Sequence, residues 1–149
     1  MTAKPIPDGY HAITPYLIVE GADKLMDFIK AAFGAKEMFR TTDTDGRIVH
    51  ADVMVGDSHV MLAEAGGEWK AMPASIYLYV NDVDATYRQA VQAGATPVRE
   101  VADQFYGDRT GGVKDTSGNY WWIATHKEDL SEEEVSRRAQ AHMKQGTFG

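Results

Sequence analysis

Three side chains in the first half of the chain could perform acid–base or metal chemistry if they converged. His50 and Asp52 stand two positions apart in an apolar run, and Glu64 ends the next run. Side chains of a strand alternate between its faces, so His50 and Asp52 share one side. Imidazole nitrogens and carboxylate oxygens are donors that divalent metals accept. One interpretation is therefore a metal site; the alternative, which we adopt, is hydrogen bonding in a polar pocket or contacts between subunits.

A second group of candidate residues lies in the segment Phe105–Arg109. The forked guanidinium of Arg109 could bind an anionic or carbonyl-bearing ligand, or form an ion pair with Asp108, Asp115 or a second subunit. Phe105 could overhang a ligand site or plug the junction between two halves of the chain. Two further histidines, His59 and His126, are expected at the surface, the latter with an interface as an alternative.

The elements that must position these residues occur twice. A β-type run, Tyr16–Val19, precedes a helix-like stripe that ends at Gly34, and a similar run, Tyr77–Val80, precedes one that ends at Gly94. The strand starts are 61 positions apart (77 − 16) and the glycines 60 (94 − 34). Such self-similarity, with only two copies, indicates one domain built from two related halves.

Each half follows the order β-α-β-β-β, which predicts an α+β fold. Strands are expected at 13–19, 37–42, 47–55, 59–64, 75–80, 96–101, 109–114 and 120–125. Asp23 and Asp84 are expected to cap the two helices. We treat residues 1–149 as a single domain, with module 1 at about 10–65, module 2 at about 73–127, and a capped polar helix at about 131–145.

The alternation of side chains predicts one sheet face packed against the helices and one open face. Leu17 and Val19, and the set Val49, Ala51, Val53 and Val55, are assigned to the helix side. The open face is assigned the remaining residues, many of them aromatic or polar: Tyr16, His50, Asp52, Leu62, Glu64, Tyr77, Tyr79 and Trp122. Aromatic rings with a few polar groups are typical of a small-molecule pocket.

Bulk composition excludes several classes of function. The chain has 149 residues, 44% of them hydrophobic and 25% charged, with a net charge of −7 and no cysteine. The acidic balance argues against nucleic acid, whose phosphates need clustered Lys and Arg. The missing cysteines remove disulfides and thiolate chemistry. No membrane-length apolar run and no signal-peptide pattern are present, so a soluble cytoplasmic protein is expected.

These motifs resemble the vicinal oxygen chelate superfamily, which includes glyoxalase I, extradiol dioxygenases and bleomycin-resistance proteins, and particularly its PhnB-like branch. The similarity spans roughly residues 10 to 127 and is carried by the segments 13–19, 32–35, 104–109 and 114–123. It implies paired βαβββ modules whose mixed sheets curve into a cup, commonly in dimers.

The resemblance also implies where a metal would bind. The ligand positions of metal-dependent members fall on Thr14, Leu62, Ser75 and Trp122, with Ala63 or Glu64 in place of Leu62 if the register shifts by one. None of the four is His, Asp or Glu, so we expect no metal and no cofactor.

We therefore expect a homodimeric protein that binds a small aromatic or amphipathic molecule in the cup between its modules. The expected ligand-binding residues are Tyr16, His50, Asp52, Glu64, Tyr77, Tyr79, Phe105, Arg109 and Trp122. The alternative is a lyase, isomerase or dioxygenase with a non-standard metal site or a metal-free one.

Overall fold

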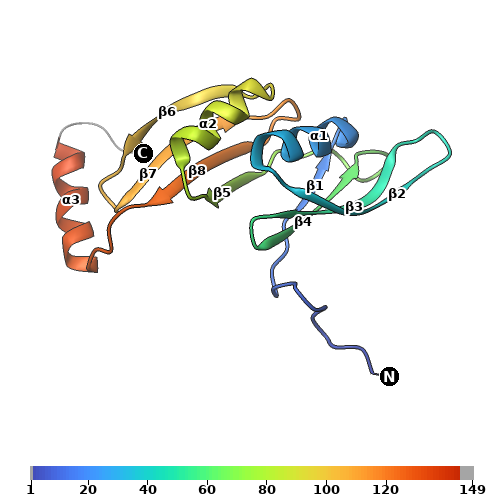
Figure 1. Cartoon of the computed structure of the whole chain (residues 1–149), viewed down its shortest axis with the longest axis horizontal. Coiled ribbons are helices and arrows are strands. Elements are labelled where there is room, and N and C mark those ends of the chain that lie inside the picture. Colours follow the sequence, from blue (N-terminus) through green and yellow to red (C-terminus); the bar gives the residue numbers. More distant parts are fainter. Residues whose placement is uncertain (1, 145–149) are drawn as a thin grey trace.

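The computed structural model describes residues 2–144 and shows the two repeats as two modules side by side (Figure 1). Module 1 consists of β1 (Tyr16–Val19), α1 (Ala22–Phe33), β2 (Lys36–Thr42), β3 (Ile48–Val55) and β4 (Ser58–Glu64). Module 2 consists of β5 (Ser75–Tyr79), α2 (Val83–Gln92), β6 (Thr96–Asp103), β7 (Asp108–Lys114) and β8 (Tyr120–His126). The helix α3 (Glu132–Lys144) follows, and its predicted end at residue 145 lies outside the described residues. The predicted βαβββ order and α+β class are confirmed.

Each module forms a mixed four-stranded sheet of its own. The strand orders are β1-β4-β3-β2 and β5-β8-β7-β6, and only the pairs β1/β4 and β5/β8 are parallel. The helix between the first two strands of each module carries the chain from one edge of the sheet to the other, and the two antiparallel connections that follow bring the chain back beside the first strand. The first and last strands of each module consequently lie side by side.

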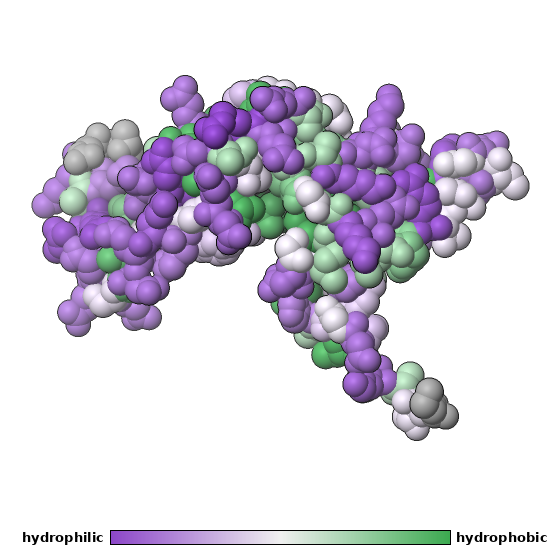
Figure 2. Space-filling model, in the orientation of Figure 1, coloured by the Kyte–Doolittle hydropathy of each residue, from purple (hydrophilic) through white to green (hydrophobic). Residues whose placement is uncertain are grey.

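Helices α1 and α2 cover the same face of the two sheets, and the opposite face is open (Figure 1). The helices also contact each other, since Nε2 of Gln89 in α2 donates to the carbonyl of Ala31 in α1 at 2.7 Å. The ring of Phe33 in α1 packs against Trp121 in β8 of the other module, with centroids 4.8 Å apart. Trp121 is fully buried. Apolar residues gather where the modules meet, as the green atoms in the middle of Figure 2 show. Burial of these side chains stabilises the pair of modules as one unit.

The register of the strands corrects three of the predicted faces. The parallel pairing sets Leu62 beside Leu17, and both are buried against α1, so Leu62 lies on the helix face. Glu64 shares that face because side chains two positions apart point the same way. Val49 is 54% exposed on the open face because a register shift between β2 and β3 interrupts the alternation, leaving Ile48 buried instead.

The helix caps also differ from the prediction. Asp23 and Asp84 lie inside the first turns of α1 and α2 rather than at the caps. Gly21, with a φ of 80°, precedes α1. Glu64 of β4 caps the N-terminal end of this helix, because its carboxylate accepts the amides of Gly21 (2.9 Å) and Ala22 (3.0 Å). In α2 the cap is Asp82, which accepts the amide of Ala85. In α1, a carboxylate distant in sequence thus accepts the first helix amides, a role assigned to Asp23 from the sequence.

Candidate ligand pocket

A cavity of about 730 Å³ opens on module 1, and the linker between the modules forms one of its walls. Its apolar lining comes from β1, the start of β3, the end of β4 and the linker: Tyr16, Ile18, Val49, Ala63, Trp69 and Met72. Four of these side chains are unusually exposed for their size, at 51% for Tyr16, 54% for Val49, 68% for Trp69 and 62% for Met72. We refer to this cavity as the module 1 pocket. All of its lining residues belong to module 1 and the linker, so it does not lie between the modules.

The linker is shaped by a short backbone turn. Gly66 and Trp69 exchange two backbone hydrogen bonds of 2.9 Å each, and Gly67 between them has a φ of 57°, a conformation that favours glycine. The amide of Met72 then donates to the carbonyl of Ile18 at 3.1 Å and ties the linker to the free edge of β1. These contacts hold Trp69 and Met72 at the rim of the pocket.

The polar end of the pocket is the hairpin between β2 and β3. Asp43 Oδ1 accepts the backbone amides of Asp45 and Arg47, each at 2.9 Å, and these bonds lower the pKa of Asp43. The guanidinium of Arg47 lies 3.4 Å from Asp43 and 3.2 Å from Asp45, and its side chain is 62% exposed. The pocket therefore has an apolar floor and rim with one cation at its end.

The residues predicted as an unorthodox metal site do not come together. His50 contacts the hydroxyl of Tyr16 at 3.4 Å, Asp52 binds His59, and Glu64 caps α1. Across the described range 2–144, no three His, Cys, Asp or Glu side chains form a group that could hold a metal ion. Of the four residues predicted in module 1, Tyr16 and Glu64 line the pocket, and the carboxylate oxygens of Glu64 are occupied by backbone amides.

Asp52 instead belongs to a closed cluster at the other end of the open face. Its carboxylate is fully buried, lies 2.6 Å from Nδ1 of His59, and accepts the hydroxyl of Tyr10. The Tyr10 ring stacks on His59 with centroids 3.7 Å apart, so the N-terminal segment covers the pair. The hydrogen bond to Asp52, together with burial, raises the pKa of Tyr10 to about 12. His59 is only 8% exposed, so its predicted surface position is wrong.

Module 2 carries a second cluster on its open face. Asp108, 4% exposed, accepts hydrogen bonds from the hydroxyls of Tyr77 (2.7 Å) and Tyr79 (2.9 Å), and Nδ1 of His126 lies 2.8 Å away. Burial works against the charge of Asp108, but the bonds from His126, Tyr77 and Tyr79 outweigh it and lower its pKa. Nε2 of His126 lies 2.8 Å from Asp129, and the two carboxylates raise the pKa of His126. Tyr77 and Tyr79 thus direct their hydroxyls to a carboxylate of their own module.

Trp122 fills the remaining open face of module 2. Its indole nitrogen donates to the hydroxyl of Ser75 at 2.9 Å, and its ring stacks with that of Tyr120. The ring lies over Gly112, where a Cβ would be only 2.5 Å from Cζ3 of Trp122. The prediction that Trp122 rather than Trp121 faces outward is confirmed by the full burial of Trp121.

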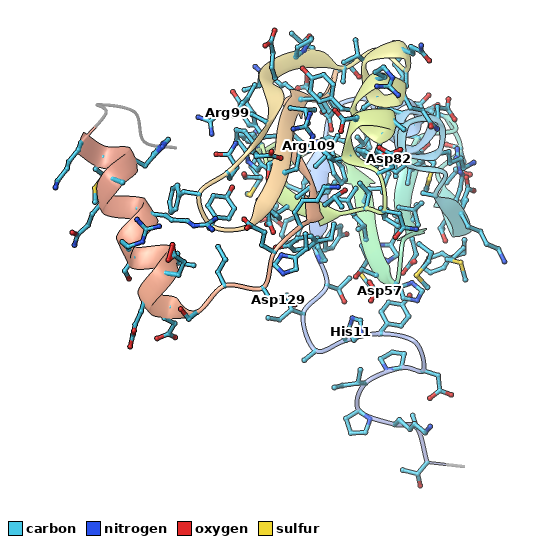
Figure 3. The ribbon with its side chains drawn as sticks, turned by 60° about the vertical axis from the view of Figure 1, so that its left-hand side comes forward. His11, Asp57, Asp82, Arg99, Arg109 and Asp129 are labelled. Atoms are coloured by element: carbon cyan, nitrogen blue, oxygen red, sulfur yellow. The ribbon has the colours of Figure 1, made fainter. Side chains whose placement is uncertain are left out.

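The two candidates from the segment 105–109 lie away from the module 1 pocket. Arg109 points to the helix side, where it binds both carboxylate oxygens of Asp84 (2.9 and 3.0 Å) and one of Asp103 (3.2 Å). These bonds raise the pKa of Arg109. Figure 3 labels Arg109 beside α2. The Phe105 ring lies 5.2 Å from His142 of α3, at the far end of module 2, so it neither overhangs the module 1 pocket nor plugs the junction between the modules.

Comparison with known proteins places this geometry in a family. The family model described as "Glyoxalase/Bleomycin resistance protein/Dioxygenase superfamily" matches residues 10–123. The chain belongs to this superfamily. It is 35% identical to uncharacterized proteins of Mycobacterium bovis and Mycobacterium tuberculosis; the match to each covers 83% of this chain, and it covers 89% of the M. bovis protein and 79% of the M. tuberculosis one.

Solved structures of the superfamily share the fold. TioX from Micromonospora sp. ML1 superposes with a TM-score of 0.68 and 25% identity, over 78% of this chain and 98% of TioX. A PhnB protein from Bacillus cereus superposes with a TM-score of 0.63 and 17% identity, over 77% and 99% of the two chains. PhnB-like proteins are thus among the structural neighbours of this chain.

The resemblance assigned possible metal-ligand positions to Thr14, Leu62, Ser75 and Trp122. Leu62 lies on the helix face, and its neighbours on the open face of β4 are Met61 and Ala63. In module 2, Trp122 and Ser75 are bonded to each other. None of these side chains offers an imidazole or a carboxylate. No chemical step is therefore assigned to a metal at these positions.

Four residues that line the pocket were assigned no ligand role from the sequence: Arg47, Val49, Trp69 and Met72. Trp69 and Met72 stand in the segment whose Gly66-Gly67 pair indicates only a linker. Two large apolar side chains so close to a glycine turn could have indicated a ligand site, because linkers are usually polar.

Proposed function

We propose that this superfamily member binds a small aromatic or amphipathic molecule in the module 1 pocket. The observation that carries the proposal is the coincidence of a 730 Å³ cavity with four exposed apolar side chains. Cavities of this volume suit drug-sized ligands, and apolar lining with few polar groups is typical of such sites. A bound ring would cover Trp69 and Met72, whose exposure to water is otherwise unfavourable.

Filling the pocket tests the proposal. Val49→Trp places a large ring at the pocket wall, whereas Val98→Trp places the same ring on β6, where Val98 is 44% exposed and outside the pocket. Titration with naphthalene and related flat molecules is expected to give saturable quenching of tryptophan emission in the wild type, and calorimetry is expected to detect this binding in the wild type and in Val98→Trp. Val49→Trp is expected to lose the binding in calorimetry. Equal binding by the Val49 and Val98 variants would remove the pocket from consideration.

The emitting residue can be assigned. Trp121 is fully buried and Trp122 is bonded to Ser75, whereas Trp69 is 68% exposed at the rim. The quenching is therefore expected to disappear in Trp69→Phe while calorimetry still detects binding. Quenching that persists in Trp69→Phe would place the ligand on module 2 instead, near Trp122.

We also propose that two copies associate through their open faces, in the cytoplasm. The supporting observation is a set of exposed apolar residues on or beside this face of both modules: Ile13 (87%), Tyr16 (51%), Tyr77 (42%) and Tyr79 (59%). Light scattering is expected to give twice the 16.4 kDa mass of the chain. Ile13→Glu is expected to reduce that mass towards one copy, and Met143→Glu, on the exposed side of α3, is not. A wild-type mass of one copy at micromolar concentration would end this proposal.

A further inference from the structure

The charges around the module 1 pocket constrain the ligand more than its apolar walls do. Two carboxylates line the pocket, those of Asp43 and Glu64, and the cation Arg47 in the lining also contacts Asp45 beside the pocket. The carboxylate of Glu64 accepts two backbone amides, and Oδ1 of Asp43 accepts two more. The acceptors of the pocket are thus largely occupied by the protein itself.

Arg47 is the group that remains able to bind a ligand. Its contacts with Asp43 (3.4 Å) and Asp45 (3.2 Å) are long, and its side chain is 62% exposed. Exposed ion pairs of this kind contribute little, so a ligand oxygen could replace one of them at small cost. A guanidinium presents several N–H donors in a plane and has no acceptor.

The sign of the surrounding charge decides which oxygen suits this donor. A ligand carboxylate at Arg47 would lie close to the carboxylates of Asp43 and Asp45 and be repelled by them, whereas a carbonyl oxygen accepts from Arg47 without adding charge. A ligand ammonium would be attracted by the carboxylates but would offer Arg47 no acceptor and would place two cations together. A neutral acceptor is the one group that meets neither penalty.

The apolar rim constrains the remaining part of the ligand. Trp69 and Met72 lie in the linker that the Gly66–Trp69 turn and the bond from Met72 to Ile18 tie to module 1, and Tyr16 and Val49 line the same pocket. A flat ring covers an indole face and a thioether with more contact area than a branched aliphatic group does. We propose that the pocket selects an uncharged planar aromatic molecule bearing a carbonyl-type oxygen, with its ring against Trp69 and Met72 and its oxygen at Arg47. This inference rests on the proposed function of the same pocket.

Four probes that share the naphthalene ring system test the selection: naphthalene, 2-naphthamide, 2-naphthoate and 2-naphthylmethylammonium. Calorimetry on the full chain is expected to give 2-naphthamide a Kd about tenfold below that of naphthalene, as expected for one hydrogen bond to a charged donor. The carboxylate and the ammonium are expected to bind more weakly than the amide. Tighter binding of either charged probe would overturn the inference.

Two variants, each with a matched control, assign the contacts. Arg47→Gln is expected to remove the advantage of the amide over naphthalene, whereas Arg137→Gln, an exposed arginine of α3 that is also paired with a carboxylate, is expected to keep it. Trp69→Ala is expected to weaken all four probes about tenfold, and Val98→Ala is expected to weaken none. An unchanged amide advantage in Arg47→Gln would overturn the inference.

The failure of this inference is distinguishable from the failure of the proposed function. If none of the four probes binds, the module 1 pocket is not a site for flat aromatic ligands and both fall. If naphthalene binds and the amide binds no better, the pocket is retained and only the role of Arg47 and the carbonyl oxygen is lost.

Discussion

The two modules agree on their helix face and differ on their open face. Glu64 ends β4 and Thr125 lies in β8, 61 positions later (125 − 64), and each accepts backbone amides at the start of the helix of its own module. On the open face, Met61 of module 1 and Trp122 of module 2 occupy matching places beside Tyr16 and Tyr77. In both modules a side chain of the last strand thus holds the start of the helix, although α2 also has its own cap, Asp82.

The difference on the open face decides where a ligand fits. In module 2 the Trp122 ring lies over Gly112 and is bonded to Ser75, and Asp108 gathers Tyr77, Tyr79 and His126. In module 1 the residue opposite Met61 is Asp52, which binds Tyr10 and His59, and a pocket lies where β1, the start of β3 and the end of β4 meet the linker. Module 2 therefore fills its open face with its own side chains, and module 1 keeps a pocket.

The largest expected effect concerns the closed cluster that bounds the module 1 face. His59→Ala would leave the fully buried carboxylate of Asp52 without its histidine partner. Removing a hydrogen-bond partner of a buried carboxylate is strongly destabilising, so we expect a loss of about 3 kcal/mol in the free energy of unfolding. Urea denaturation measures it. His50→Ala, on the same strand face but with only a 3.4 Å contact, is the control and is expected to change stability by less than about 0.5 kcal/mol.

The packing of Trp122 over Gly112 can be broken directly. Gly112→Val would drive a side chain into the indole, and overpacking of this kind costs about 2 kcal/mol. The double variant Gly112→Val, Trp122→Ala is expected to lose less stability than the sum of the two single variants, since each change makes room for the other. Additive losses in thermal unfolding would mean that Trp122 does not fill module 2 as described.

The helix faces predict two smaller effects, the larger of them in α1. Glu64→Ala and Thr125→Ala each remove an acceptor for the first amides of a helix, in α1 and α2 respectively. We expect about 1 kcal/mol from Glu64→Ala, the usual cost of losing an N-terminal cap, and about 0.5 kcal/mol from Thr125→Ala, because Asp82 still caps α2. Hydrogen exchange of the amides of Ala22 and Val83 reports the local loss. A large effect in one module alone would separate the two helix faces.

The same comparison shows what the sequence could and could not predict. The repeat, the strands and the buried stripes were predicted because alternation and helical spacing are local properties. The face of Leu62 was not, because the pairing of β4 with β1 sets it. The cap of α1 was missed because Glu64 is 43 positions from Gly21. The role of Trp69 in the pocket was not predicted, because a glycine pair indicates a turn but does not indicate which sheet the following residues cover.

The smallest expected effect is a pH dependence confined to module 2. His126 has a raised pKa, chiefly because of Asp108 and then Asp129, so its charged form is favoured in the folded protein. The stabilisation is present in full below the ordinary pKa of 6.5 and is lost as the pH rises through the raised value. NMR titration of the ring is expected to show a larger fall in this pKa for Asp108→Asn than for Asp129→Asn. The reason is that Asp108 is buried whereas Asp129 is fully exposed on the segment leading to α3, where salt and water screen it (Figure 3). The opposite order would show that Asp129, on the segment leading to α3, favours the charged form of His126 more than the buried Asp108 does.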